Sequence, residues 1–142
     1  MRERVLGIAA TAAVWGSMVF IVVFNHQFEA RGIVRWAGLA LVAGGATLLV
    51  LGGLGLGGAV SGSFIPKALV TTGVYKTIRH PMYLGGALSL AGLGLYVGSA
   101  IGICATVVLA WPGYWFSAAA EDARLRENYG ARYEAYRKRT WM

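Results

Sequence analysis

Charged side chains and cysteine are both scarce in this sequence. Only 13% of the 142 residues are charged, whereas 57% are hydrophobic and the mean hydropathy is +0.59. This balance lies well outside that of ordinary soluble domains of similar length. The single cysteine, Cys104, falls inside an apolar run, so a disulfide framework and a cysteine-based metal site are both excluded. The composition predicts an all-α integral membrane protein.

Acidic residues are fewer still. They number 6 against 13 Lys and Arg, which gives a net charge of +7. The basic residues flank apolar runs, where attraction to anionic lipid headgroups explains them, so we expect no nucleic-acid partner. The two histidines, His26 and His80, fall on opposite sides of the topology derived below, and no ligand cluster has metal-binding spacing. We therefore expect no metal site.

The first half of the chain contains two apolar runs long enough to span a membrane. A span needs about 20 apolar residues, and residues 5–24 supply them without a charge. Residues 36–60 form the second run. In this run Gly38, Gly45 and Gly52 recur every seven residues, which predicts a small-residue face for close helix packing.

The second half predicts two more spans and a surface helix. Residues 81–117 form an uncharged run that is longer than one span requires. A turn at Gly98-Ser99 would divide this run into two spans. The last segment alternates apolar and polar residues at helical spacing, as an amphipathic helix does. The whole chain, 1–142, is thus expected to be one membrane domain with spans over about 5–24, 36–60, 81–97 and 100–117, a loop over 61–80 and a surface helix over 118–138.

Lys and Arg distribute unevenly between the two sides of this four-span topology. Eleven lie on the side of the termini and the 61–80 loop, whereas only Arg31 and Arg35 lie on the other. Because Lys- and Arg-rich loops stay in the cytoplasm, we expect both termini to be cytoplasmic, in the plasma membrane of a prokaryote. The glycine-rich faces also allow a homodimer.

The sequence Arg79-His80-Pro81 begins the third predicted span. Proline suits the first turn of a helix, because its missing N–H would have no partner there. His80 is then near the N-cap and Tyr83 lies three residues on, where free N–H groups and the helix dipole favour an anion such as a carboxylate. The alternative is that Arg79 reaches lipid headgroups and His80 only caps the helix.

Glu121 and Asp122 are adjacent acids about one turn beyond the fourth predicted span. Two carboxylates there can hold an ammonium group or ribose hydroxyls. The alternative is an ordinary helix start, with the acids paired to nearby arginines. Aromatic residues lie on both sides of the pair, and we interpret them as an interfacial belt or as walls around a cationic or lipid ligand: Trp111, Trp115, Tyr129, Tyr133, Tyr136 and Trp141.

Two stretches resemble signatures of one enzyme superfamily. Residues 69–86, LVTTGVYKTIRHPMYLGG, are similar to the Leu-Val-x-x-Gly-x-Tyr and Arg-His-Pro-x-Tyr signature of the membrane-embedded isoprenylcysteine carboxyl methyltransferases and phospholipid methyltransferases. Residues 120–139, AEDARLRENYGARYEAYRKR, resemble the second signature, an acidic pair followed by Leu and an aromatic-Gly-x-x-Tyr-x-x-Tyr run. Both occur in the expected order.

The resemblance implies transfer of a methyl group from S-adenosylmethionine to a lipophilic acceptor from the bilayer, with S-adenosylhomocysteine as product. Carried over by position, it implies that Arg79, His80, Tyr83, Glu121 and Asp122 bind the cofactor. Transfer from an activated sulfonium needs alignment and a dry pocket more than a strong acid or a metal. No catalytic residue is therefore assigned.

Two departures from the family pattern bear on the acceptor. Asp122 replaces a second glutamate, and Ala131-Arg132 follows the aromatic-Gly step where the carboxyl methyltransferase branch usually carries glutamate. The second departure argues against isoprenylcysteine itself as acceptor. Tyr133, Arg137 and Lys138 are candidates for holding the acceptor, the two cations through an anionic group.

Two other functions stay open from sequence alone. Sterol reductases carry a similar Arg-His-Pro-x-Tyr element and a related topology, so a membrane reductase that uses NADPH is one alternative. A small transporter or structural membrane protein is the other. Coupled transporters generally place an ionisable residue within a span, and the apolar runs here contain none.

Overall fold

The structure is a computed structural model, and its regular elements are all helical within the residues that it describes: 16, 19–20, 23–24, 27–56 and 69–141. The all-α prediction is confirmed over these residues. The first predicted span, 5–24, lies largely outside them. Residues 57–68, at the end of the second span and in the predicted loop, lie wholly outside them.

Helix α2 (Gly32–Leu56) and helix α3 (Pro81–Val97) pack together through glycine. The three α2 glycines at spacing seven are the buried residues of that helix, so the predicted small face is confirmed. A Cβ on Gly38 would lie 2.8 Å from the Gly92 carbonyl oxygen, and one on Gly45 would lie 2.5 Å from that of Gly85. The two backbones therefore approach more closely than larger residues would allow.

A tight turn follows α3 at Gly98, where the predicted break falls. Gly98 has a φ of +75°, a conformation that favours glycine, and a Cβ there would collide with the Phe28 carbonyl oxygen. The Ser99 hydroxyl then accepts a hydrogen bond from the Gly102 N–H at 3.0 Å and caps helix α4 (Ala100–Ala105).

Helix α4 continues without a break through a π-helical turn, η3 (Thr106–Ala110), into helix α5 (Trp111–Tyr129). The π turn precedes Pro112, whose ring does not fit a regular α-helical ladder, and the Trp111 N–H donates to the Thr106 carbonyl five residues back. The helix predicted to begin at residue 118 is instead the continuation of this one. Residues 118–120 are alanines, which favour helix, so nothing interrupts it there.

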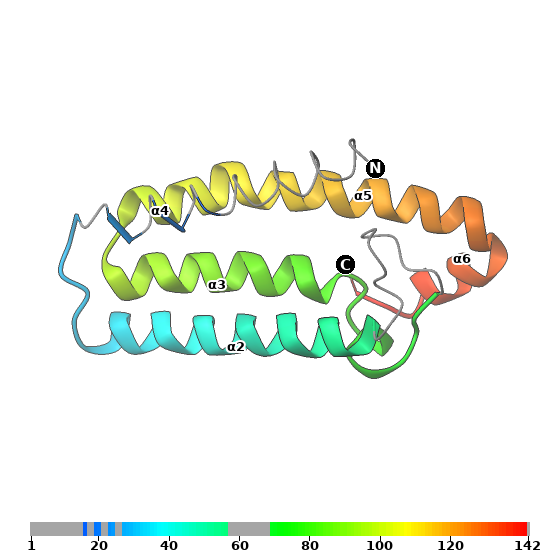
Figure 1. Cartoon of the computed structure of the whole chain (residues 1–142), viewed down its shortest axis with the longest axis horizontal. Helices are drawn as coiled ribbons and strands as arrows, with labels where there is room; N and C mark the ends of the chain where they lie inside the picture. The colour runs from blue at the N-terminus through cyan, green and yellow to red at the C-terminus, as the bar shows by residue number, and fades with distance from the viewer. Residues whose placement is uncertain (1–15, 17–18, 21–22, 25–26, 57–68, 142) are drawn as a thin grey trace.

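Gly130 ends α5, and helix α6 (Ala131–Arg137) turns back from it. Its φ of +48° is unfavourable for residues with a side chain. The surface helix predicted over 118–138 is therefore divided between α5 and α6. Beyond α6, the Trp141 N–H donates to the Thr77 carbonyl at 2.8 Å, and the Arg79 N–H donates to the Trp141 carbonyl at 3.1 Å. Figure 1 shows α2, α3 and α4–α5 side by side, with α6 and the C-terminus near the start of α3.

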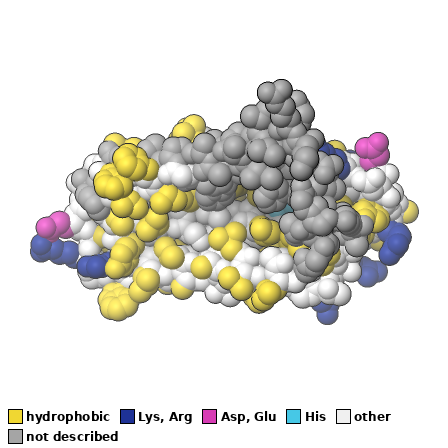
Figure 2. Space-filling model, viewed as in Figure 1, with side chains coloured by type: hydrophobic (Ala, Val, Ile, Leu, Met, Phe, Trp, Pro, Cys, Tyr) yellow, Lys and Arg dark blue, Asp and Glu magenta, His cyan; other side chains and the backbone are white. Residues whose placement is uncertain are grey.

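Two helices are long and apolar enough to cross a membrane, Gly32–Leu56 and Ala100–Tyr129. Helix α3 is apolar but shorter, with 17 residues. In Figure 2 hydrophobic side chains lie on the left and are scattered over the middle of the face, and charged side chains gather toward its two ends, as in a membrane protein. The number of spans stays a prediction.

Candidate functional site

The start of α3 places His80 beside an acid of α5. Pro81 occupies the first helical position and His80 the N-cap, but the imidazole ring does not cap the helix. Its Nε2 lies 2.8 Å from Oδ1 of Asp122 instead. Because the His80 side chain is only 4% exposed, this contact is shielded from water.

Asp122 is the centre of the polar cluster. Its Oδ1 also lies 3.5 Å from Nε of Arg79 and accepts a hydrogen bond from the Tyr133 hydroxyl. The Arg79 side chain is 13% exposed, so it points into the protein rather than toward lipid headgroups. Glu121 lies on the other side of the imidazole, with Oε2 3.6 Å from Nδ1 of His80. The structure therefore brings the two sequence constellations together.

The contacts favour a charged pair between His80 and Asp122. Burial by itself lowers the pKa of His80, but hydrogen bonds to Asp122 and Glu121 and the charges of both acids outweigh it, so the pKa of His80 is raised. Burial raises the pKa of Asp122, but hydrogen bonds from His80 and Tyr133, with the charges of His80 and Arg79, lower the pKa of Asp122 overall. Both shifts favour an imidazolium facing a carboxylate.

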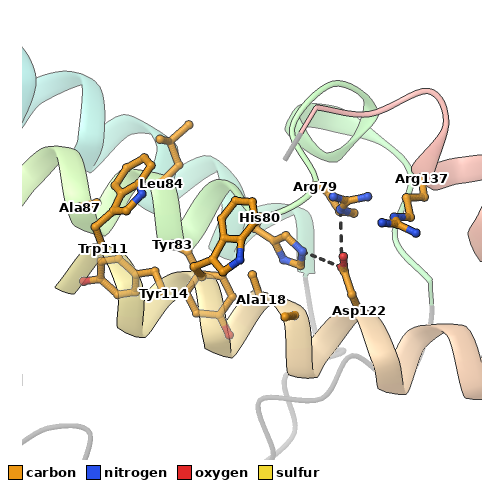
Figure 3. Close-up of a pocket in the computed structure, with 12 residues that line it drawn as sticks. Arg79, His80, Tyr83, Leu84, Ala87, Trp111, Tyr114, Ala118, Asp122 and Arg137 are labelled. Atoms are coloured by element: carbon orange, nitrogen blue, oxygen red, sulfur yellow. Dashed lines mark hydrogen bonds and ion pairs between the residues drawn. The ribbon is translucent and has the colours of Figure 1, made fainter. Parts of the chain in front are cut away.

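Arg79, His80 and Asp122 line the polar end of a pocket between α3 and α5 (Figure 3), whereas Glu121 lies outside its lining. The pocket has a volume of about 210 Å³, whereas a cavity needs only about 10–15 Å³ to hold one water molecule, so it admits a larger ligand. Arg137 of α6 lines the same polar end. The opposite end is lined by apolar and aromatic side chains: Leu84 and Ala87 of α3, and Trp111, Tyr114 and Trp115 of α5.

Aromatic rings connect the two ends. The ring centroids of His80 and Tyr83 lie 5.7 Å apart, and those of Tyr83 and Tyr114 lie 5.9 Å apart. Tyr114 is a residue that sequence reasoning missed. A signal was present, because residues 111, 114, 115, 118 and 122 recur at helical spacing and so share the face that ends at the acid.

The other predicted site residues have different surroundings. Tyr133 is fully buried and lies outside the pocket lining, although its hydroxyl contacts Asp122. Lys138 is exposed at the end of α6 and also lies outside the lining. Among the described residues, no group of three or more His, Cys, Asp or Glu has the geometry of a metal site.

Comparison with known proteins gives a family match over most of the chain. The family model described as phospholipid methyltransferase matches residues 33–132, which include Arg79-His80 and Glu121-Asp122. The chain is also 31% identical over 71 residues to the protein-S-isoprenylcysteine O-methyltransferase of Schizosaccharomyces pombe. That match covers 50% of this chain and 30% of the relative. No solved structure matches the chain at a significant level.

Proposed function

Because the chain belongs to the phospholipid methyltransferase family, we propose that it is a membrane methyltransferase that moves a methyl group from S-adenosylmethionine to a lipophilic acceptor. The observation that carries this proposal is the pocket between α3 and α5. Arg79, His80 and Asp122 meet at its polar end, directly beside aromatic and apolar walls. Such a pocket suits a charged cofactor next to a hydrophobic acceptor.

The residues at the polar end fit the charged parts of S-adenosylmethionine. Arg79 Nε is buried without a hydrogen-bond partner among the described residues, and a guanidinium suits a carboxylate. All three contacts of Asp122 within the described part of the chain use Oδ1. Its Oδ2, with Glu121 alongside, is therefore suited to accept from an ammonium group or from ribose hydroxyls.

The aromatic residues supply the environment for methyl transfer. When bound, S-adenosylmethionine provides a methyl group on a positively charged sulfur. The faces of Tyr83, Tyr114 and Trp111 attract positive charge and keep water away. The chain's part is then to align the cofactor with the acceptor, and no nucleophile of its own is required.

The acceptor is proposed from the apolar end of the pocket and from the names of the matching family and of the relative. The matching family model is named for phospholipid and the relative for S-isoprenylcysteine, and both groups are lipophilic. Leu84 and Ala87 offer contacts to a hydrocarbon chain. Arg137, at the polar end, can hold an anionic group on the acceptor. Neither comparison supports the reductase or the transporter alternative.

The membrane topology is part of the proposal. Helix α2 and the helix Ala100–Tyr129 can each cross the bilayer. We propose that α3 and residues 5–24 cross it as well, which gives four spans with both termini in the cytoplasm. The polar end of the pocket then lies at the cytoplasmic edge, where a soluble cofactor can enter and a lipid acceptor can approach from the bilayer.

Cofactor binding tests the proposal directly. The detergent-purified chain is titrated by calorimetry with S-adenosylmethionine, S-adenosylhomocysteine and NADPH. We expect saturable binding of both adenosyl compounds and none of NADPH. Asp122→Asn should weaken that binding by about tenfold or more, because hydrogen bonds to a charged group are worth about 1.5–3 kcal/mol.

Glu127→Gln is the matched control, because Glu127 is an exposed acid on the same helix. Its affinity should equal that of the parent protein. If a folded parent sample in restored membrane lipids binds neither adenosyl compound, the proposed function is wrong. If Asp122→Asn binds as the parent does, the assigned site is wrong.

A further inference from the structure

Tyr133 lies behind the pocket wall and contacts one of the residues that line the pocket. Its side chain is fully buried in a small core with Leu125 and Tyr136, packed against Leu69 and Tyr129. It lies outside the residues that line the pocket, so its ring offers no surface to a ligand. Its hydroxyl nevertheless donates to Oδ1 of Asp122, which does line the pocket.

The turn at Gly130 allows the Tyr133 hydroxyl to reach Asp122. Tyr133 follows Asp122 by 11 residues, which in an unbroken helix would separate them by about 16 Å along the axis. The positive φ of Gly130 turns the chain instead, and the Tyr133 N–H donates to the Gly130 carbonyl at 3.1 Å. Helix α6 therefore returns beside α5 and carries the hydroxyl to the acid.

The partners of Asp122 come from two separate elements. Arg79 and His80 reach it from the segment that begins α3, and Tyr133 reaches it from α6. Glu121, its neighbour on α5, contacts the far nitrogen of His80. A carboxylate held from both sides has restricted rotation, which keeps its remaining acceptor positions in one place.

We propose that Tyr133 is a positioning residue of the cofactor site, which orients Asp122 through its hydroxyl without touching the ligand. The inference rests on the proposed function in one respect, that the oriented carboxylate serves S-adenosylmethionine. The contact itself does not depend on which ligand the pocket holds.

The pKa of Asp122 provides a readout that is specific to its contact with Tyr133. Burial, and then the hydrogen bond to Asp122 and its charge, raise the pKa of Tyr133, so the phenol stays a neutral donor around neutral pH. That donor, with His80 and Arg79, lowers the pKa of Asp122. Tyr133→Phe keeps the ring and removes the hydroxyl. It should therefore raise the pH at which Asp122 takes up its proton.

Asp122 is the sole aspartate in the sequence, so its titration can be observed directly. Protein made with carbon-13 in the aspartate side-chain carboxyl gives one resonance, whose position is followed against pH in detergent. Tyr136→Phe is the matched control, because Tyr136 belongs to the same core but donates its hydroxyl to the Tyr75 carbonyl at 2.8 Å. We expect a higher midpoint in Tyr133→Phe and the parent midpoint in Tyr136→Phe.

The affinity for S-adenosylhomocysteine supplies the second readout. Tyr133→Phe should bind it about five- to tenfold more weakly, as for one lost hydrogen bond of ordinary strength, because Tyr133 acts on the ligand only through Asp122. The loss of binding at acid pH should also begin at a higher pH than in the parent protein. Equal midpoints in Tyr133→Phe and the parent, or the same shift in Tyr136→Phe, would overturn the positioning role. If the parent does not bind S-adenosylhomocysteine, the proposed function fails, and the Asp122 midpoint still decides whether Tyr133 holds the carboxylate.

Discussion

At the scale of single residues, His80 ties the stability of the site to pH. Its pKa is raised in the folded protein, so its protonated ring stabilises the fold fully below about pH 6.5, the ordinary histidine value. That stabilisation is lost as the pH rises through the raised folded-state pKa. We expect the parent protein to melt several degrees above His80→Gln in mildly acidic detergent solution, with the gap narrowing at alkaline pH. A gap that does not change across this range would contradict the charged pair.

The residues of the polar cluster were accessible to sequence reasoning because they lie in short motifs. Arg79, His80 and Asp122 were expected at the cofactor, and the structure brings them together at one pocket. Tyr114 was not expected, because its signal is only the helical spacing that places it on the face of Asp122 and no short motif contains it. The surroundings of Tyr133 depend on a reversal of the chain three residues earlier, and spacing in a presumed continuous helix places it elsewhere.

At the scale of elements, the effect of replacing a glycine of α2 depends on whether that glycine faces α3. A Cβ on Gly45 would lie 2.5 Å from the Gly85 carbonyl oxygen, whereas one on Gly44 meets nothing within 4 Å. Gly45→Ala should lower the melting temperature in detergent, because overpacking costs about 1–3 kcal/mol. Gly44→Ala should leave it unchanged or raise it, since alanine is the better helix former. Equal melting temperatures for the two variants would show that the helices do not approach this closely.

The reversal at Gly130 gives a second prediction at this scale. Its positive φ makes an alanine there costly by about 1–3 kcal/mol, although the space around it is open. Gly130→Ala should displace α6, weaken S-adenosylhomocysteine binding and expose the C-terminal residues to protease. Gly113→Ala is the control, because that glycine also has open space but lies within α5 without a positive φ. Loss of binding in both variants would argue against a specific role for the turn.

Some elements were predicted from sequence and others were not, because only some of them depend on local signals. The seven-residue glycine spacing and the turn at Gly98 are local signals, and both are present in the structure. In the C-terminal segment Gly130 is a local signal for the end of α5, but the place where α6 packs is not set locally. It depends on the packing of α6 side chains against Leu125, which competes with the helical preference of residues on both sides of Gly130.

At the scale of the whole molecule, the excess of Lys and Arg on the side of the termini predicts that both termini lie in the cytoplasm. In a Cys104→Ser background, a cysteine replacing exposed Lys138 should react with a membrane-impermeant maleimide in inside-out vesicles. A cysteine replacing exposed Arg31 should react in intact cells instead. Labelling of both from the same side would contradict the four-span topology.

The unbroken helix from Ala100 to Tyr129 connects the proposed fourth span to the site. Its 30 residues span about 45 Å, so a change in tilt of about 2° moves one end by about 1.5 Å relative to the other. Asp122 lies near one end, and displacements of about 1 Å are enough to slow group transfer. Because helices tilt to match the hydrocarbon thickness, methyl transfer should peak in vesicles of one acyl-chain length and fall in thinner and thicker ones. Bilayer thickness would then set the rate of the proposed methyl transfer to an acceptor from the bilayer.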